Sequence, residues 1–445
     1  MRRPALLSCL LLPLVFFFAL RGGTLESRTV SGFVLDVFPE GALRLEEGLT
    51  VTVSPSTQVR YKGHVYQGHL LVGFEIKARG RLDREANMLS AEEIDVLSHL
   101  EEEIDGTAIL EERSEKGDKL FLVADGRQLQ IPGGIGLSPV KEKDLEAVQS
   151  LEGVVPGVFL RYRGRRTFEG TVEIKELSAW KNHLEEKENT LYVQYKPEML
   201  LPRDGTGPTV LKVDKNRYGV VGDAEVQRYL DRLGTALLPG RWRDAEESTR
   251  EGLQFWFFVV QHDRPQASAF PGGVVVVHTG LFRVAENEAQ MVFALAHEIA
   301  HVTQEHAWRE YLYHRKKLAV LRWGTAGLGY VVESAIRSGH SRDLEEQADR
   351  LALWYMVQAG YDPREGIQFL KRLEETQLRL PGLLWDTHKS SGRRREALME
   401  ELAFYSARGL DYNPLVRDKA EFSRMRDQLL KATIESNKEV TSSPR

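Results

Sequence analysis

The stretch that decides the fold of this chain is residues 287–303, Asn-Glu-Ala-Gln-Met-Val-Phe-Ala-Leu-Ala-His-Glu-Ile-Ala-His-Val-Thr. Asn287, followed three residues later by Gln290, is typical of a helix N-cap with a capping box. Apolar residues then recur at steps of three and four positions, which predicts a buried helix face. These residues are Met291, Val292, Leu295, Ile299 and Val302. We therefore expect a long amphipathic helix that packs into a core.

The same helix carries His297, Glu298 and His301 in the pattern His-Glu-x-x-His. Two histidines four residues apart on an α-helix lie ~40° apart around the axis and one turn apart along it. Both imidazoles can therefore reach one Zn²⁺, which binds histidine nitrogen at ~2.0–2.1 Å. Glu298 projects beside the histidines, so its carboxylate can take a proton from a water molecule that the metal activates.

A catalytic zinc takes a third protein ligand and keeps one position open. Residues 341–349, Ser-Arg-Asp-Leu-Glu-Glu-Gln-Ala-Asp, place Glu345 and Asp349 four positions apart on one helix face. As part of a metal site, Glu345 would be the third ligand and Asp349 the hydrogen-bond partner of a ligand imidazole, whose tautomer it fixes. The alternative for this acidic segment is a solvent-exposed, salt-bridged helix surface. His306 is expected to face elsewhere, because a continued helix would place it ~140° around the axis from His301.

These motifs together resemble the zinc metallopeptidase family that includes the CAAX prenyl endopeptidase, the membrane heat-shock protease HtpX and the soluble periplasmic protease BepA. The resemblance spans about residues 223–402 and includes the Gly-Tyr-Asp-Pro sequence at 360–363. It implies that His297, His301 and Glu345 bind one Zn²⁺ per chain and that Glu298 is the general base. It also implies an α+β fold, with a mainly helical zincin-type domain that contains a small sheet, as in the soluble branch of the family.

A substrate site is expected on the strand before the metal helix. Residues 266–273, Gln-Ala-Ser-Ala-Phe-Pro-Gly-Gly, take the place of the family's Asn-Ala-Phe-Ala-x-Pro-Gly-Gly. We expect an extended substrate to join this region, from 269 to 277, by main-chain hydrogen bonds. The predicted substrate-binding residues are Ala269, Phe270, Gly272 and Gly273.

His388 is the second predicted catalytic residue. It stands in Thr387-His388-Lys389, where the family usually has Thr-His-Pro. It could donate a hydrogen bond to the oxyanion of the tetrahedral intermediate. Alternatively, it could swing in as a fourth zinc ligand and close the site. The missing proline leaves this loop less rigid, which favours the movable latch, and the remaining alternative is a solvent-exposed loop histidine.

The N-terminal half of the chain carries an internal repeat. Residues 73–80, Gly-Phe-Glu-Ile-Lys-Ala-Arg-Gly, match residues 157–164, Gly-Val-Phe-Leu-Arg-Tyr-Arg-Gly. This repeat predicts two small all-β modules that resemble OB-like barrels, serving as scaffolds or as binding modules for envelope polymer or client protein. The expected divisions are β modules at 29–100 and 101–180, a linker at 181–215, the metallopeptidase domain at 216–410 and a charged helical tail with a disordered end at 411–445.

The N-terminus and the composition limit where the protein acts. Residues 1–25 combine Arg2 and Arg3 with an apolar stretch at 5–20, which is typical of an export signal peptide or an N-terminal anchor. The one cysteine, Cys9, lies in this leader, so a metal site must use His, Asp or Glu. A formal net charge of −5 excludes a globally basic nucleic-acid binder.

The sequence therefore predicts an exported zinc-dependent endopeptidase of the periplasm or cell envelope, with envelope or misfolded proteins and peptides as substrates. Membrane association would be peripheral or through residues 5–20. The physiological substrate, the cleavage preference and the oligomeric state stay open. Two alternative functions also stay open: a chaperone or assembly factor with a latent protease site, and a zinc peptidoglycan hydrolase.

Overall fold

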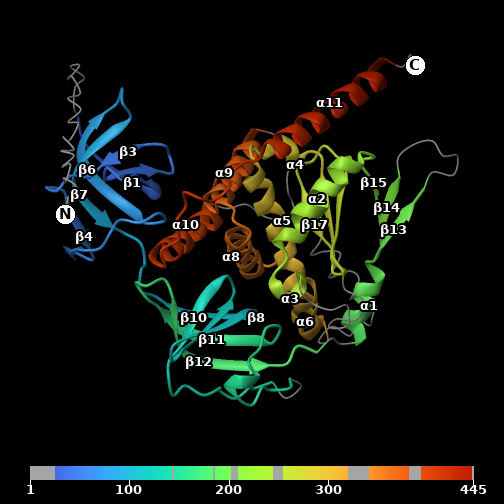
Figure 1. Ribbon diagram of the computed structural model, residues 1–445, viewed down its shortest axis with the longest axis horizontal. Helices are drawn as coiled ribbons and strands as arrows, with labels where there is room; N and C mark the ends of the chain where they lie inside the picture. Colours follow the sequence, from blue (N-terminus) through green and yellow to red (C-terminus); the bar gives the residue numbers. More distant parts are fainter. Residues whose placement is uncertain are drawn as a thin grey trace, which may run out of the picture. The chain divides into compact units, whose positions relative to one another are not determined.

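The computed structural model describes residues 26–142, 145–183, 186–201, 209–243, 254–318, 340–379 and 392–442. The predicted leader, His388 and the predicted disordered end of the tail lie outside these ranges. The chain separates into two compact units, Met1–Leu70 with Glu75–Leu97 and Leu71–Phe74 with Ser98–Arg445 (Figure 1). Within the part of the chain that is described, no helix is both long enough and apolar enough to cross a membrane.

The first unit is an all-β module whose strands form a closed circuit. The antiparallel pairs β1–β2, β2–β3, β1–β6 and β6–β7 are joined by the parallel pair β3–β7, and β4 and β5 extend the sheet beyond β7. In β6, Ile76, Ala78 and Gly80 are buried and alternate with exposed residues, as expected for a strand that lines a core. The strands are β1 (Glu26–Val37), β2 (Ala42–Leu45), β3 (Thr50–Thr52), β4 (Gln58–Tyr61), β5 (His64–Val65), β6 (Glu75–Asp83) and β7 (Met88–Val96).

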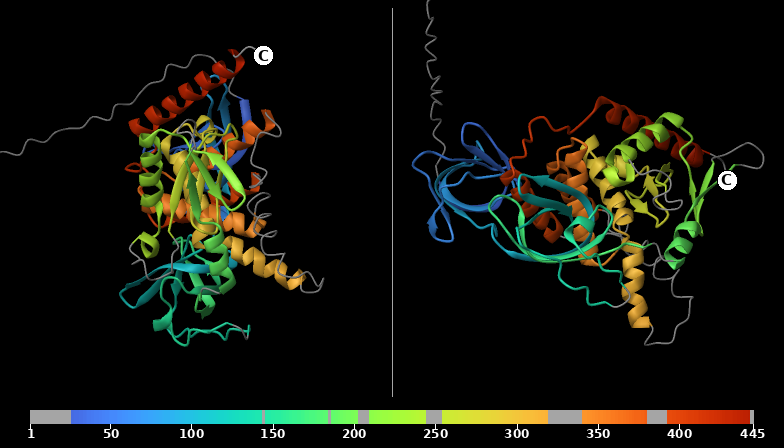
Figure 2. Two further views of the ribbon diagram at one scale, coloured as in Figure 1. Left: turned by 90° about the vertical axis from the view of Figure 1, so that its right-hand side faces the viewer. Right: turned by 60° about the horizontal axis from the view of Figure 1, so that its bottom comes forward.

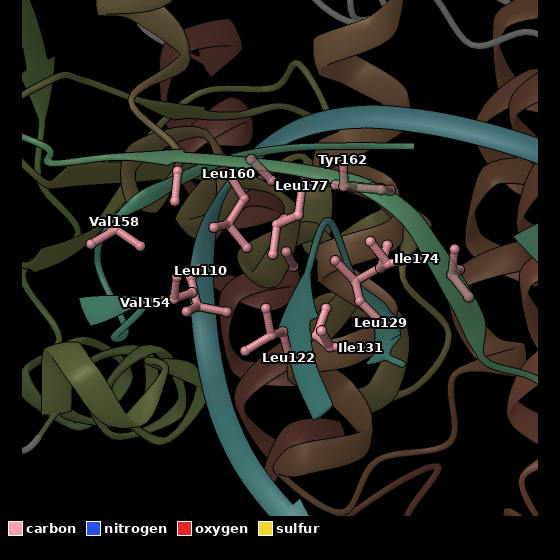
Figure 3. Packing of buried hydrophobic residues seen from close by; sticks show 14 residues of the cluster. Leu110, Leu122, Leu129, Ile131, Val154, Val158, Leu160, Tyr162, Ile174 and Leu177 are labelled. Atoms are coloured by element: carbon pink, nitrogen blue, oxygen red, sulfur yellow. The ribbon is translucent and has the colours of Figure 1, made fainter. Parts of the chain in front are cut away.

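The second unit begins with a closed five-stranded barrel in the order β10-β12-β11-β8-β9, of which only the β10–β12 pair is parallel. Its strands are β8 (Glu103–Lys116), β9 (Lys119–Ala124), β10 (Arg127–Ile131), β11 (Phe159–Arg166) and β12 (Val172–Trp180). Figure 3 shows buried side chains from opposite walls, among them Leu110, Leu122 and Leu160, converging inside the barrel. This apolar filling makes the interior a packed core.

The two segments matched by the sequence repeat lie on corresponding strands of the two circuits. Strands β1, β2, β3, β6 and β7 pair in the same order and direction as β8, β9, β10, β11 and β12. Both modules have an irregularity in register immediately before Gly80 and Gly164. A Cβ atom at Gly80 would lie 2.0 Å from the Ser90 carbonyl oxygen, and one at Gly164 would lie 2.4 Å from the Glu173 oxygen. Close backbone approach at the bulge therefore accounts for the repeated glycine.

The segment predicted as a linker that docks onto the next domain, 181–215, does pack against that domain and contains regular secondary structure. It contains α1 (Glu186–Gln194), β13 (Pro197–Leu200) and β14 (Val210–Val213), and β14 also pairs with β15 (Asn216–Gly219). Leu191, Tyr195 and Leu211 are buried in one cluster with Phe270 and Val274. Leu191 and Tyr195 are four residues apart, as on one helix face, but two such residues in a polar segment are too few to predict a helix.

The remaining part of the second unit combines helices with a small sheet in the order β16-β18-β17, so the protein is a mixed α+β structure. Helix α5 is buried along its whole length and packs against α8, α9, α2 and β17. Helix α11 lies beside α2, where Arg232 pairs with Glu421 (Figure 2). The elements are α2 (Ala224–Leu237), α3 (Gly240–Arg243), β16 (Trp256–Val260), β17 (Ala267–Ala269), β18 (Val274–His278), α4 (Leu281–Val284), α5 (Glu288–Thr303), α6 (His306–Leu318), α8 (Arg342–Gln358), α9 (Arg364–Arg379), α10 (Gly392–Ala407) and α11 (Ala420–Ser442).

Candidate metal centre

Helices α5 and α8 bring His297, His301 and Glu345 together in a buried cluster. The Nε2 atoms of the two histidines lie 3.0 Å apart. Glu345 Oε2 lies 3.5 Å from His297 Nε2, and its Oε1 lies 3.6 Å from His301 Nε2. Ligand atoms ~2.0–2.1 Å from a tetrahedral Zn²⁺ lie ~3.3 Å from one another. The spacing and the N,N,O donor set therefore fit zinc.

The positions of these ligands follow from local sequence. Asn287 caps α5, as expected, by accepting a hydrogen bond from the Gln290 N–H at 3.0 Å. On α8, Ala348 and Ala352 are fully buried, and their small side chains allow this helix to approach α5 closely. The His340 N–H, two residues before the start of α8, donates a hydrogen bond to Glu345 Oε1 at 3.3 Å.

Asp349 contacts His297 on the side away from the cluster centre. Its Oδ1 lies 2.9 Å from His297 Nδ1. Arg394 on α10 binds both oxygens of the same carboxylate at 2.6 Å. Burial by itself would raise the pKa of Asp349, but the charges of Arg394 and His297 hold it below its ordinary value. The ionised carboxylate accepts the Nδ1 proton of His297, which leaves Nε2 directed at the cluster centre.

His297 and His301 have opposite pKa shifts. Burial lowers the pKa of His297, but its hydrogen bonds to Asp349 and Glu345 outweigh burial and raise it. Burial, together with the neighbouring His340, holds the pKa of His301 well below its ordinary value. The His301 ring is stacked on His340, with ring centroids 4.2 Å apart. His301 is therefore neutral at pH 7, the form that can bind a metal.

His306 is not among the three grouped side chains, as expected, but it contacts His301 from the side opposite the cluster, which the helical spacing did not predict. Helix α5 ends at Thr303, and Glu305 adopts a left-handed conformation with φ of 55°. This residue interrupts the helix before α6 begins at His306, so the angular spacing of a continued helix does not apply. His306 is completely buried, and its Nδ1 lies 2.9 Å from His301 Nδ1.

Sequence reasoning also missed the roles of Arg394 and Gln347. Arg394 lies six residues after His388, and nothing in its spacing links it to Asp349. Gln347 stands between Glu345 and Asp349 in the same helix turn. Its Oε1 lies 3.1 Å from His306 Nε2. The position of Gln347 between two residues with predicted roles was the one feature of the sequence that could have pointed to it.

Glu298 lies between the two histidines in sequence and is 1% exposed. Its place on α5, one residue from His297, keeps its carboxylate near the cluster without making it one of the three grouped ligands. Glu298 is therefore an acidic side chain close to the three grouped side chains but not one of them.

The predicted substrate region divides into an edge strand and a turn. Val274–His278 form β18, which is paired on both sides and cannot accept a further strand, so that part of the expectation is wrong. The Phe270 N–H donates to the Val274 carbonyl and the Gly273 N–H to the Phe270 carbonyl. The Phe270 side chain is buried, and a Cβ at Gly272 would lie 3.0 Å from the Tyr192 carbonyl oxygen.

Ala269 is the predicted substrate residue that lies on the edge strand, β17. Phe270 bonds to Val274 and Gln266 to His278 across the β17–β18 pair. Alternation in an antiparallel ladder therefore turns the backbone N–H and C=O of Ala269 away from β18. Strand β17 also contacts α5, which places this edge beside the metal helix.

Comparison with known proteins finds similarity in the same part of the chain that contains the cluster. Residues 227–402 match Peptidase family M48. The chain is 28% identical over 252 residues to the beta-barrel assembly-enhancing protease of Yersinia pestis, covering 47% of this chain and 50% of that protein. It is 28% identical over 172 residues to the protease of the same name from Escherichia coli (strain K12), covering 35% and 34%.

A third relative is the mitochondrial metalloendopeptidase OMA1 of Bos taurus, 33% identical over 160 residues that cover 31% of this chain and 30% of that protein. The chain spans half or less of the length of each of these three relatives. The matched region contains α5, α8 and all three clustered side chains. Residues 227–402 thus match an M48 metallopeptidase domain, and the chain is similar to metallopeptidases through this region.

Proposed function

We propose that this protein is a zinc-dependent endopeptidase in which His297, His301 and Glu345 hold the metal and Glu298 is the general base. The observation that carries the proposal is the 3.0–3.6 Å spacing between the donor atoms of three buried side chains, within the region that matches Peptidase family M48. When bound, zinc supplies a Lewis acid that polarises the scissile carbonyl and lowers the pKa of water.

Side chains of the protein carry out the proton transfer and hold the metal ligands in position. Glu298 takes the proton of the attacking water and passes it to the leaving amine. Asp349 and Arg394 hold His297 in the tautomer and orientation that a ligand needs, through contacts of 2.9 Å and 2.6 Å. Burial of all these groups excludes bulk water and strengthens the electrostatic interactions among them.

Substrate binding is assigned to the outer edge of β17. A peptide in extended conformation adds to this edge through the main-chain groups of Ala269, and its scissile bond then lies beside α5. This mode is independent of side-chain sequence, which suits unfolded or misfolded proteins. We therefore assign the protein to quality control of exported proteins, with the segment 1–25 as its signal peptide or anchor.

His388 and the two β modules complete the proposal. We assign His388 the role of a latch that binds the metal in the resting state. We describe both modules as OB-like, supported by the shared circuit of antiparallel strands closed by one parallel pair. Relatives named for β-barrel assembly support a role in the cell envelope.

Cleavage of casein by purified protein tests the activity. Wild type loaded with zinc should degrade casein, and Glu298→Gln with the same zinc content should not. Equal cleavage by the two proteins would contradict the general-base assignment. Digestion of purified sacculi instead of casein would identify a peptidoglycan hydrolase, and suppression of aggregation with no cleavage would identify a chaperone. Proteins trapped by Glu298→Gln and identified by mass spectrometry would define the substrates.

A further inference from the structure

The second β module is joined to the metal ligands by a continuous chain of hydrogen bonds. His301 Nδ1 lies 2.9 Å from His306 Nδ1, and His306 Nε2 lies 3.1 Å from Gln347 Oε1. Gln347 Nε2 in turn donates to Asp125 Oδ1 at 3.1 Å and to the Thr107 carbonyl at 3.2 Å. Thr107 lies on β8 and Asp125 in the turn between β9 and β10, so the chain ends in the barrel.

The barrel residues Asp125 and Thr107 determine which groups donate and which accept in this series of hydrogen bonds. A carboxylate and a carbonyl only accept hydrogen bonds, so Gln347 must present its NH₂ group to Asp125 and Thr107. Its Oε1 therefore faces His306, and Arg309 Nη1 also donates to that oxygen at 2.5 Å. The Asp125 carboxylate is buried and pairs with Arg350 at 2.7 Å, which keeps it ionised and therefore an acceptor only.

The same logic determines the state of both imidazoles. Facing an acceptor, His306 Nε2 must carry a proton, and in a neutral ring its Nδ1 is then an acceptor. His301 Nδ1 must donate to it. The His301 Nε2 lone pair is thereby directed at the cluster centre, as metal binding requires.

We propose that Gln347 and His306 are positioning residues through which the barrel residues Asp125 and Thr107 set the tautomer of His301. The inference rests on the proposed metal site. Helix α8 then holds both ligand histidines by their Nδ1 protons: His297 directly through Asp349, and His301 through Gln347 and His306. The second β module is thus a component of the metal site and not a spacer.

Breaking this series of hydrogen bonds has a specific consequence for the protein before it binds metal. The Nε2 atoms of His297 and His301 lie 3.0 Å apart, so a His301 that has lost its Nδ1 acceptor can carry its proton on Nε2 and donate it to His297. That tautomer blocks the nitrogen that should bind zinc. Zinc must then restore the other tautomer at a cost in binding free energy.

The experiment measures the ¹⁵N chemical shifts of the histidine rings in the metal-free full chain, and zinc affinity by competition with a chelator. Wild-type His301 should be protonated at Nδ1. His306→Leu and Gln347→Met should show a mixture of His301 tautomers and bind zinc ~10–100-fold more weakly. His306→Asn should retain most of the affinity, because its Oδ1 can replace the Nδ1 acceptor.

Tyr162→Phe is the matched control, since Tyr162 donates to Asp125 Oδ2 at 3.0 Å without contacting Gln347. It should lower thermal stability and leave the His301 tautomer and zinc affinity unchanged. Wild-type tautomer and affinity in a folded Gln347→Met would overturn the inference even if His306→Leu fails to fold. Failure of wild type to bind zinc would instead contradict the proposed function, while the metal-free spectra would still report on the hydrogen-bond chain.

Discussion

Asp349 Oδ1 lies 2.9 Å from His297 Nδ1, which joins the middle of α8 to the middle of α5 at the point where the candidate metal ligands meet. The other side of the same carboxylate binds Arg394 on α10. The buried Asp349 carboxylate thus links α8 to both α5 and α10. The predictions below separate the groups that bind the metal from those that orient its ligands.

Removal of any one ligand should abolish stable zinc binding. His297→Ala, His301→Ala and Glu345→Ala each leave two donors, whereas Glu298→Gln should retain one zinc per chain and lose turnover. Metal analysis of the purified variants measures this difference. The control is His314→Ala, which changes a half-exposed histidine on α6. Loss of zinc from Glu298→Gln would show that this glutamate is a ligand.

Asp349→Asn should weaken zinc binding by ~10–100-fold without abolishing it. The amide removes the charge that orients His297 and that pairs with Arg394. A chelator competition assay measures the affinity. Asp343→Asn, an exposed position in the first turn of the same helix, is the matched control and should bind zinc like wild type. An unchanged affinity in Asp349→Asn would remove Asp349 from the site.

Ala269→Pro should raise KM for an unfolded protein substrate several-fold while zinc content stays constant. Proline removes an N–H that faces away from β18, and edge strands tolerate proline at such positions. Ala269→Val, which keeps the N–H, is the control for side-chain size. If the proline variant cleaves casein with wild-type KM, substrate does not bind along β17 through this residue.

His388→Ala distinguishes the two catalytic roles proposed for that histidine. Removal of a latch should increase the basal rate of casein cleavage, because a resting ligand no longer competes for the metal. Removal of an oxyanion donor should slow cleavage by a factor that corresponds to ~2.7–4 kcal/mol. Initial rates at saturating substrate measure the effect, and an unchanged rate would identify an ordinary exposed loop histidine.

Glu401→Gln should destabilise the protein at neutral pH by ~3–5 kcal/mol. Glu401 accepts hydrogen bonds from Arg127 at 2.8 Å and 3.0 Å and pairs with Arg166, which joins α10 to the barrel. Burial alone would raise the pKa of Glu401, but the guanidinium groups of Arg127, Arg166 and Arg350 lower it to about 2. The stabilisation is therefore fully present above the ordinary glutamate pKa and is lost as pH falls through about 2.

Denaturant unfolding across this pH range measures the effect, and wild type and Glu401→Gln should converge at the acidic end. Glu400→Gln is the control on the same helix. Burial and then the charge of Glu102 raise the pKa of Glu400, so its neutralisation should not destabilise the protein at pH 7. A constant difference between wild type and Glu401→Gln at all pH values would contradict the ion-pair explanation.

By itself the sequence determined the local elements that carry the chemistry. The helix of His297 and His301, its Asn287 cap and the shared face of Glu345 and Asp349 follow from spacing along a single helix, which depends only on helical geometry. The repeated glycines likewise marked equivalent positions in the two β circuits, because the bulge requires them.

Only the tertiary structure decided how these elements meet. The break at Glu305 places His306 against His301, and no helical periodicity extends across a break in the helix. Arg394, Gln347 and Asp125 act through contacts between segments far apart in the chain, which leave no trace in local spacing. The structured segment at 181–215 was hidden for the same reason: its few buried residues gain their partners only when the sheet of β16, β17 and β18 has formed.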